Sequence, residues 1–332
     1  MEARWSRRKA WSWYEGWPWI VGCNFTPSTA GNQIELWQEE SFDIETIGRE
    51  LSWAGGLGFN TVRVYLHDLV WLADPDGLKA RMSLFLETAS RFGIRTIFVF
   101  FDDCWNQKPC LGKQPDPRPG VHNSIWVQSP GSSVVADPSR WGRLEDYVRD
   151  VVGSFRSDER ILLWDLYNEP GNNNLGEASL GLLKSAFKWA REARPTQPLS
   201  VGVWYHSPTL NEYQLSASDV VTFHNYKDVA RLEKDIEDLK AYGRPMICTE
   251  YMARSMGSRF VTHLPVFRRE RVGCVSWGLV SGRAQTIYPW GSQEGSPEPS
   301  EWFHDILRRD GTPFDAVEVS LIRNIIGVGR LS

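Results

Sequence analysis

Several features that define other classes of protein are absent from this sequence. Its 37 basic and 41 acidic side chains give a net charge of −4, so it lacks the basic surface that binds nucleic acid. No apolar run approaches the roughly 20 residues that span a bilayer, so no membrane partner is expected. The N-terminus also lacks the apolar core of a signal peptide. We therefore expect a cytoplasmic protein, or a secreted one if a leader has been removed, and the oligomeric state is left open.

Cysteine is scarce, and the five cysteines do not have metal-binding spacing. Cys23, Cys248 and Cys274 fall in apolar runs, where cysteine acts as a small buried hydrophobic residue. Cys104 and Cys110 share one loop and form either a disulfide or two free thiols, and a reducing compartment favours the thiols. The six histidines show no paired spacing either. The sequence therefore predicts no metal site.

A glycine-rich phosphate-binding turn is also missing. After the first apolar run the chain reads Cys23-Asn24-Phe25-Thr26-Pro27, without the glycines that a dinucleotide-binding fold places there. The cluster Gly55-Gly56-Leu57-Gly58 precedes the second apolar run and is interpreted as the end of a helix. No cofactor is therefore expected.

Tryptophan, by contrast, is abundant, with 17 residues. Several must fill the core, because each indole buries a large area where it packs. Trp105, Trp126 and Trp290 fall in predicted loops, where an exposed indole needs a reason. Stacking on the apolar face of a sugar is one such reason, and contact with another protein is the other.

The chain alternates short apolar runs with longer amphipathic stretches, which is typical of βα units around a parallel sheet. Strands are predicted over residues 19–25, 61–65, 96–101, 161–166, 199–204, 220–224, 246–250 and 274–279. Helices are predicted over 44–54, 78–91, 141–155, 180–193, 229–242, 258–269 and from 302 onward, whereas 210–218 is hardly long enough for a full helix. These eight units predict a single-domain (β/α)8 TIM barrel over residues 1–332, with a doubly wound open sheet as the alternative.

Two loops are too long to be plain connections. They span residues 103–138 and 282–299, after the third and the eighth predicted strands. Because both follow strands, they belong to the face where barrel enzymes keep their chemistry. The loops either form a pocket around a terminal group or extend a cleft, and we favour the pocket.

Two glutamates close predicted strands. Glu169 follows the apolar run 161–166, and Glu250 ends the run 246–250. Two such carboxyl groups at one face of a barrel can cleave a glycosidic bond, one as proton donor and the other as an ionised carboxylate. Taken alone, each glutamate is explained as well by a solvated strand end.

The other polar residues at these strand ends complete a pattern. The sequence places an Asn-Glu-Pro after the fourth strand, a His-x-Tyr at the sixth, a glutamate at the seventh and a tryptophan in the eighth. This order resembles the retaining glycoside hydrolases of clan A, especially family 5, the cellulase-type family. The resemblance implies an O-glycosyl hydrolase that cleaves a β-linked oligo- or polysaccharide, or removes terminal sugar units, by double displacement without metal or cofactor. The matching residues are Arg63, Asn168, Glu169, His224, Tyr226, Glu250 and Trp277.

By this resemblance Glu169 is the acid/base and Glu250 the nucleophile. Arg63 would favour the ionised form of Glu250 by its opposite charge, and Tyr226 would orient that carboxylate by a hydrogen bond. Burial beside a second carboxylate would keep Glu169 protonated. The carboxyl groups of a retaining pair are expected to lie about 5 to 5.5 Å apart.

The remaining matches would contact the sugar. Asn168 would donate to the sugar 2-hydroxyl, His224 would lie near the acid/base, and Trp277 would form the floor of the subsite. Each matching residue also has a structural explanation. Arg63 could be an ion pair inside the barrel, Tyr226 a half-buried strand residue and Trp277 part of the core.

The sequence departs from the family at the third strand, where a histidine is usual. Here the chain carries Asp102 and Asp103, and either could accept a hydrogen bond from a sugar hydroxyl. This places ordinary cellulase specificity in doubt. Further candidates for sugar contacts are the loop tryptophans and His67, Asp68, Trp204 and His206, and the last four are explained equally well as surface residues.

Two other functions fit much of this pattern. A transglycosidase would use the same residues with an acceptor that outcompetes water. A barrel that binds carbohydrate without cleaving it would keep the aromatic residues but lack one of the two acids, and both acids are present here.

Overall fold

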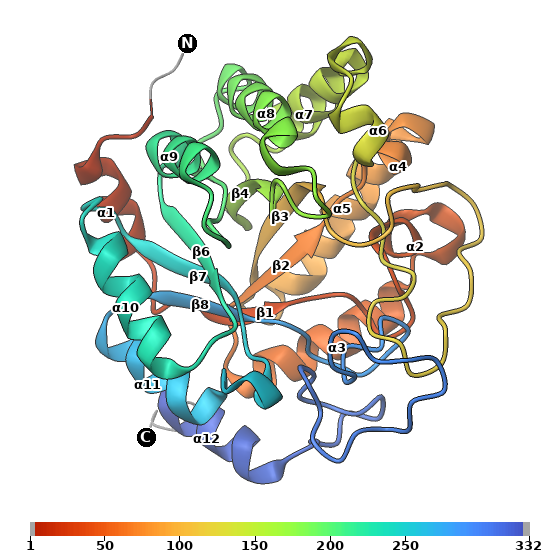
Figure 1. Cartoon of the computed structure of the whole chain (residues 1–332), viewed down its shortest axis with the longest axis vertical. Helices are drawn as coiled ribbons and strands as arrows, with labels where there is room; N and C mark the ends of the chain where they lie inside the picture. Colours follow the sequence, from red (N-terminus) through yellow and green to blue (C-terminus); the bar gives the residue numbers. More distant parts are fainter. Residues whose placement is uncertain (1–3, 328–332) are drawn as a thin grey trace.

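The computed structural model describes residues 4–327, which are organised around one eight-stranded parallel sheet. The strands follow one another in the order β5-β4-β3-β2-β1-β8-β7-β6, and a parallel bridge between Val203 and Phe223 joins the two outer segments. The sheet therefore curls into a nearly closed barrel, which Figure 1 shows ringed by helices. The strands are β1 (Val21–Asn24), β2 (Thr61–Tyr65), β3 (Arg95–Asp102), β4 (Ile161–Asn168), β5 (Leu199–Ser200), β6 (Val221–Asn225), β7 (Met246–Tyr251) and β8 (Gly273–Ser276). The predicted (β/α)8 barrel is confirmed, and the open-sheet alternative is wrong.

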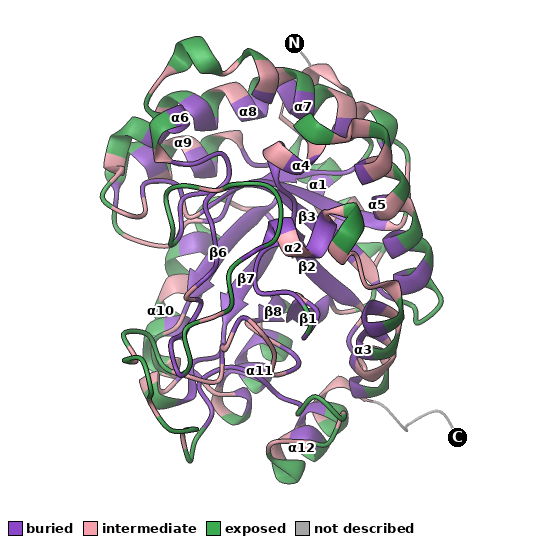
Figure 2. Ribbon diagram, turned by 90° about the vertical axis from the view of Figure 1, so that its right-hand side faces the viewer, coloured by how far each residue is buried: buried purple, intermediate pink, exposed green. Residues whose placement is uncertain are grey.

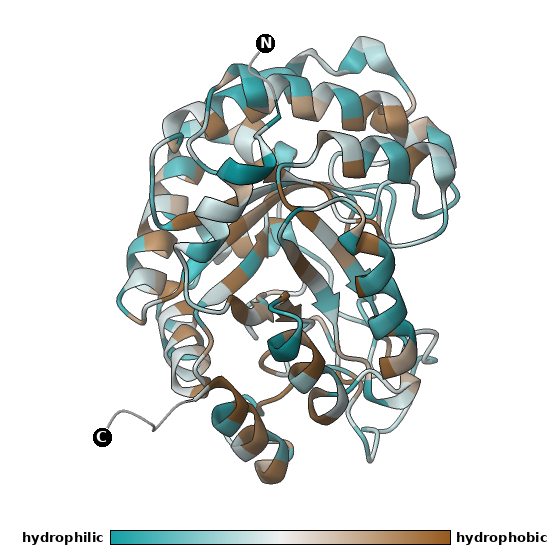
Figure 3. Ribbon diagram, turned by 90° about the vertical axis from the view of Figure 1, so that its left-hand side faces the viewer, coloured by the Kyte–Doolittle hydropathy of each residue, from teal (hydrophilic) through white to brown (hydrophobic). Residues whose placement is uncertain are grey.

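The helices cover the outside of the barrel with their apolar faces turned inward. Figure 2 shows buried residues on the strands and on the inner sides of the helices, and Figure 3 shows that the helices are amphipathic in hydropathy as well. The helices are α1 (Arg7–Glu15), α2 (Gln33–Trp37), α3 (Ile44–Leu57), α4 (Asp68–Ala73), α5 (Pro75–Ser90), α6 (Ser132–Val135), α7 (Gly142–Ser154), α8 (Leu180–Glu192), α9 (Pro208–Ala217), α10 (Val229–Lys240), α11 (Phe260–Arg269) and α12 (Ala316–Ile326). No helix among residues 4–327 is long and apolar enough to cross a membrane.

Local signals in the sequence set the limits of α3. The side chain of Asp43 caps its first turn by accepting a hydrogen bond from the backbone N–H of Thr46. The helix ends at Gly58, whose φ of 90° lies in the left-handed region that glycine adopts without strain. The interpretation of residues 55–58 as a helix end is confirmed.

The sequence did not reveal α1, which closes the amino-terminal end of the barrel. Tyr14 of this helix packs with Ile20, Ile97 and Val275, and Trp13 is packed against the same cluster. Several of the abundant tryptophans are thus used to seal the barrel.

Two other predictions needed correction. The predicted helix from residue 302 begins only at Ala316, because the Arg254 guanidinium binds the carbonyl oxygens of Trp302, His304 and Asp305, which a helix would use internally. The fifth strand is two residues long, and the segment after it forms a full helix, α9. The side chain of Gln214 in α9 donates to the carbonyl oxygen of Gly202, where a longer strand would have used a neighbouring backbone.

Candidate active site

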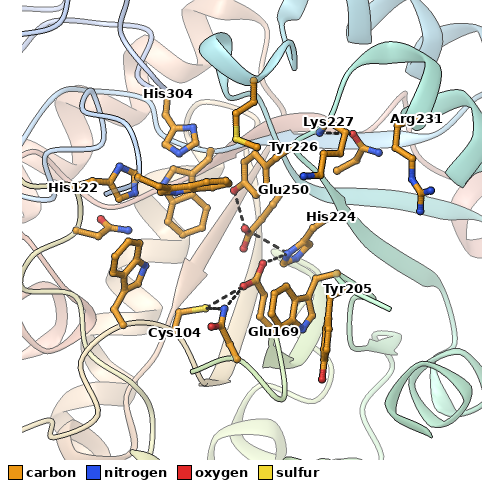
Figure 4. A pocket seen from close by; sticks show the side chains of 18 of the residues that line it. Cys104, His122, Glu169, Tyr205, His224, Tyr226, Lys227, Arg231, Glu250 and His304 are labelled. Atoms are coloured by element: carbon orange, nitrogen blue, oxygen red, sulfur yellow. Dashed lines mark hydrogen bonds and ion pairs between the residues drawn. The ribbon is translucent and has the colours of Figure 1, made fainter. Parts of the chain in front are cut away.

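A cavity of about 960 Å³ lies at the carboxyl ends of the strands and is lined by both glutamates. Glu169 directly follows β4 with a φ of 44°, a left-handed conformation that is uncommon outside glycine. Glu250 lies within β7 and is 4% exposed. Figure 4 shows the two carboxylates at the centre of the cavity, close to His224 and Tyr226.

The two carboxylates and the ring of His224 form one compact group. One carboxylate oxygen of each glutamate and a ring nitrogen of His224 lie within 4.8 Å of one another. Nδ1 of His224 is 2.9 Å from Oε1 of Glu169 and 3.5 Å from Oε2 of Glu250. Two acids this close can act on a single bond between them.

Glu250 is held by three donors. Oε1 accepts hydrogen bonds from Arg63 at 2.7 Å and from the hydroxyl of Tyr65 at 2.8 Å, and Oε2 accepts from the hydroxyl of Tyr226 at 2.8 Å. Burial and the adjacent Glu250 carboxylate raise the pKa of Tyr226 well above its ordinary value, so the phenol keeps its proton. These contacts hold the Glu250 carboxylate in one orientation.

Arg63 connects Glu250 to the interior of the barrel. Its guanidinium also pairs with Asp165 at 2.8 Å and donates to the side-chain oxygens of Asn24 and Asn168 at 2.9 and 2.8 Å. A buried cation with two carboxylate partners and several acceptors is a fixed structural element, because breaking any pair would leave a buried charge unpaired.

Glu169 is surrounded by donors as well. Asn172 donates to Oε2 at 2.7 Å, and the thiol of Cys104 lies 3.3 Å from the same oxygen. Burial raises the pKa of Glu169, but the hydrogen bond and charge of His224, with the bonds from Cys104 and Asn172, outweigh it, so the pKa lies below its ordinary value. The expectation that burial would keep Glu169 protonated is therefore wrong for the free protein.

Cys104 is a free thiol, as is Cys110.

Asp102 lies behind the cavity and fixes Asn168. Its carboxylate accepts hydrogen bonds from Asn168 at 3.0 Å, from the indole of Trp126 at 2.8 Å and from the backbone of Cys104 at 2.9 Å. Burial raises the pKa of Asp102 to about 6. Protein donors thus occupy both oxygens of Asp102, which was predicted to contact sugar but does not line the cavity. The side-chain amide of Asn168 donates a hydrogen bond to Asp102, and its side-chain oxygen accepts one from Arg63.

Asp103 and His67 are also directed into the protein. Asp103 accepts hydrogen bonds from Tyr167, Gly171 and Ser179, and burial raises its pKa to about 7. Nε2 of His67 lies 2.9 Å from the carbonyl oxygen of Gln128, while Nδ1 accepts from a backbone N–H. Neither residue lines the cavity, so the structure does not bring these two candidates together with the glutamates.

The other candidates divide into those that line the cavity and those that do not. Trp105, Trp204, Trp277 and Trp290 line it together with His224 and Tyr226. Trp126 is buried beneath the floor, where its ring packs against Tyr65 and Trp277. The buried Asp68 forms an ion pair with the partly exposed Arg143, and His206 is exposed outside this cavity.

Several residues of the site were not predicted as such. Tyr65 lies two positions after Arg63 on β2, so the strand period places both on one face, a signal that was available. Cys104, Tyr205, His122, Asn123 and His304 line the cavity from loops, where periodicity gives no signal.

Glu169, His224 and Glu250 could also be considered as metal ligands. In the part of the chain that the structure describes, they are the one group of three acidic, histidine or cysteine side chains with ligand atoms so close together. The oxygens of Glu250 already accept hydrogen bonds from Arg63, Tyr65 and Tyr226, and the guanidinium of Arg63 would repel a cation. The arrangement therefore favours proton transfer and nucleophilic attack over metal binding.

Comparison with known proteins identifies a family and a shared fold. The model of the cellulase family, glycosyl hydrolase family 5, matches residues 30–282. A GH5_18 protein from Streptomyces cattleya, solved with GlcNAc, superposes with a TM-score of 0.62 at 14% identity, covering 93% of this chain and 80% of that one. The exo-β-1,4-mannosidase from Opitutaceae bacterium strain TAV5 superposes with a TM-score of 0.64 at 17% identity, covering 93% of this chain and 60% of that one. The endo-β-1,4-mannanase from Thermotoga petrophila superposes with a TM-score of 0.61 at 14% identity, covering 93% of this chain and 76% of that one. A search of curated proteins found no match.

Proposed function

The chain belongs to glycosyl hydrolase family 5, and from that premise we propose that it is a retaining enzyme with Glu250 as nucleophile and Glu169 as acid/base. The family makes it a glycoside hydrolase acting on β-linked sugars. The observation that supports the retaining mechanism is the approach of the two carboxylates, since one oxygen of Glu169 lies within 4.8 Å of one oxygen of Glu250. Retaining pairs are about 5 to 5.5 Å apart, whereas inverting pairs leave about 6.5 to 9.5 Å for a water molecule.

In the first step, a carboxylate oxygen of Glu250 forms a bond to the anomeric carbon while the bond to the leaving oxygen breaks. Glu169 gives its proton to that leaving oxygen. Arg63, Tyr65 and Tyr226 hold Glu250 in place, so little reorganisation is needed as its charge is lost to the new bond. Because the pKa of Glu169 is lowered in the free protein, the proton must be taken up at acidic pH or as the substrate displaces its donors.

In the second step, Glu169 removes a proton from water, and the resulting hydroxide bonds to the anomeric carbon as the ester to Glu250 breaks. The product keeps the configuration of the substrate, because the carbon is attacked twice from opposite faces.

Glu169→Ala and Glu250→Ala separate the two roles. With a dinitrophenyl glycoside, whose leaving group needs no proton, Glu169→Ala should still form the glycosyl-enzyme, and azide should then accelerate turnover and give a glycosyl azide of retained configuration. Glu250→Ala should lose activity by many orders of magnitude and give only an inverted azide product. Glu177→Ala, at an exposed position of the short 3-10 helix Gly176–Ser179 that follows Glu169, is the matched control and should behave as the parent protein.

Other results would contradict the assignment. If azide rescues Glu250→Ala with retention, the two roles are exchanged. If neither substitution slows hydrolysis of an established substrate, the active site lies elsewhere.

A further inference from the structure

The two long loops of the catalytic face are joined by hydrogen bonds. The backbone N–H of Asn123 donates to the carbonyl oxygen of Ala284, and that of Gly295 donates to Pro119, at 2.9 and 2.8 Å. The side chain of Gln285 accepts from the N–H of Gly120 at 3.0 Å and donates to two carbonyl oxygens of the same loop. Figure 1 shows the two loops side by side. Together they form a continuous structure, which we call the loop wall (residues 115–123 and 283–295).

The inner side of the loop wall is aromatic and lies next to the nucleophile. The ring of Trp290 is 5.0 Å from that of Tyr226, whose hydroxyl binds Glu250. His122 lies between the rings of Trp105, at 5.4 Å, and His304, also at 5.4 Å. Tyr226 therefore connects Trp290 of the wall to the reacting carboxylate.

The acid/base shows which part of the substrate faces the wall. Glu169 protonates the leaving oxygen, so the leaving group extends past Glu169 towards Trp204 and Tyr205, whose ring centroids lie 4.2 Å apart with the planes tilted by 41°. The sugar that bonds to Glu250 lies on the other side. Figure 4 shows His122 and His304 on that side of the glutamates, with Tyr205 and Arg231 across the cavity. The cavity is bordered by the exposed Arg231 at the leaving-group end and by the wall at the sugar end.

Two imidazoles give the closed end a polar surface. Nδ1 of His122 lies 2.7 Å from the carbonyl oxygen of Tyr288, and Nδ1 of His304 lies 2.5 Å from that of Met252. Carbonyl oxygens only accept, so each Nδ1 carries the proton and each Nε2 keeps a lone pair. Burial lowers the pKa of His122 to about 4 and that of His304 well below its ordinary value, so both rings are neutral. Both rings line the cavity, and each carries an acceptor nitrogen of the kind that a sugar hydroxyl can bind.

We propose that the loop wall closes the cavity one sugar beyond the bond that is cleaved, so that the enzyme removes single sugars from the non-reducing end of its substrate. Three observations support this proposal: Trp290 lies beside Tyr226, hydrogen bonds join the two loops of the wall, and the imidazoles of His122 and His304 at this end carry acceptor nitrogens. A further sugar would take away a hydroxyl donor and collide with the wall. The inference rests on the function proposed above, because Glu169 and Glu250 define the two ends of the cavity.

The test compares 4-nitrophenyl β-glycosides of one sugar with the corresponding β-1,4-linked biosides, for mannose, glucose and xylose. With a closed site, the monoside releases nitrophenol at once, whereas the bioside releases it only after a lag in which free monosaccharide appears. If the bioside releases nitrophenol without a lag and faster than the monoside, the closed end is refuted and the proposed function stands. If no glycoside in the panel is hydrolysed, the proposed function itself is contradicted.

Opening the wall should change the ratio of these two rates. Trp290→Ala removes the indole beside Tyr226, and Gln285→Ala removes hydrogen bonds that join the loops without altering a residue that lines the cavity. Both should raise direct release from the bioside relative to the monoside by about tenfold or more, a factor of ten corresponding to about 1.4 kcal/mol of binding. Tyr242→Ala, an exposed aromatic residue outside the cavity, should leave the ratio unchanged. An unchanged ratio in both wall variants would contradict the proposal.

Discussion

Nδ1 of His224 lies 2.9 Å from Oε1 of Glu169, and this contact opposes the effect of burial on the acid/base. Burial alone would raise the pKa of Glu169, but the hydrogen bond and charge of His224 lower it. Since the same nitrogen is 3.5 Å from Oε2 of Glu250, the imidazole also lies between the two carboxylates. His224 therefore contacts both carboxylates and lowers the pKa of Glu169.

Replacing His224 by phenylalanine should move the alkaline limb of the pH profile of kcat/KM towards higher pH. This limb reports the essential acid of the free enzyme, and without the imidazole burial is left to raise the pKa of Glu169. The profile is measured with a nitrophenyl glycoside whose leaving group needs proton donation. A dinitrophenyl glycoside is the control, because its profile should lack this limb in both proteins. A limb that stays in place, or moves to lower pH, would contradict the role of His224.

Replacing Asp103 by asparagine should flatten the dependence of stability on pH. Burial raises the pKa of Asp103 to about 7, whereas an unfolded aspartate titrates near about 3.9. Between these values the folded state holds a proton that the unfolded state has lost, so stability falls as pH rises, by up to about 1.4 kcal/mol per pH unit. Asp103→Asn lacks this titration, and its amide can keep the partners Tyr167, Gly171 and Ser179.

Urea unfolding of the parent and the variant at intervals from pH 5 to pH 8 measures this difference. The free energy of unfolding of the parent should decline more steeply than that of Asp103→Asn. Asp76→Asn, at a side chain that is 98% exposed, is the control and should follow the parent. Equal slopes for the parent and Asp103→Asn would show that Asp103 is ionised in the fold.

The thiols should differ sharply in reactivity. Cys110 is exposed, whereas Cys23, Cys104, Cys248 and Cys274 are buried. Burial raises the pKa of all four buried thiols, so little thiolate is available for reaction. Titration of the native protein with a chromogenic thiol reagent should therefore detect one fast thiol, which Cys110→Ser removes, and five after denaturation. Only three thiols in the denatured, unreduced protein would indicate a disulfide between Cys104 and Cys110.

Residues on strands could be placed from the sequence because the barrel fixes where strand ends meet. Arg63 and Glu250 were expected to be neighbours, and the structure places them 2.7 Å apart. The same period of two would have added Tyr65 to the set. The strand pattern thus contained most of the surroundings of Glu250.

The direction of loop side chains and the partners of buried acids could not be predicted in this way. Asp102 follows an apolar run as Glu250 does, yet donors from Trp126, Asn168 and Cys104 occupy its carboxylate. His122 and His304 come from separate loops and are oriented by backbone carbonyl groups, a relation that residue types do not encode. Hydrogen-bond saturation, rather than polarity, decides which acids face the substrate.

Two glycine-to-alanine substitutions should have opposite effects on stability. A Cβ at Gly22 in β1 would lie 1.7 Å from the carbonyl oxygen of Thr61, its partner on β2, so the two strands would have to separate. Gly22→Ala should therefore reduce the free energy of unfolding by about 3 kcal/mol or more. At the exposed Gly56 in α3, a Cβ would meet nothing within 4 Å. Gly56→Ala should stabilise the protein by about 0.5 to 1 kcal/mol, because alanine has the better helix propensity. Urea unfolding of both variants measures the difference, and a Gly22→Ala protein as stable as the parent would show that β1 and β2 are not packed as closely as this register requires.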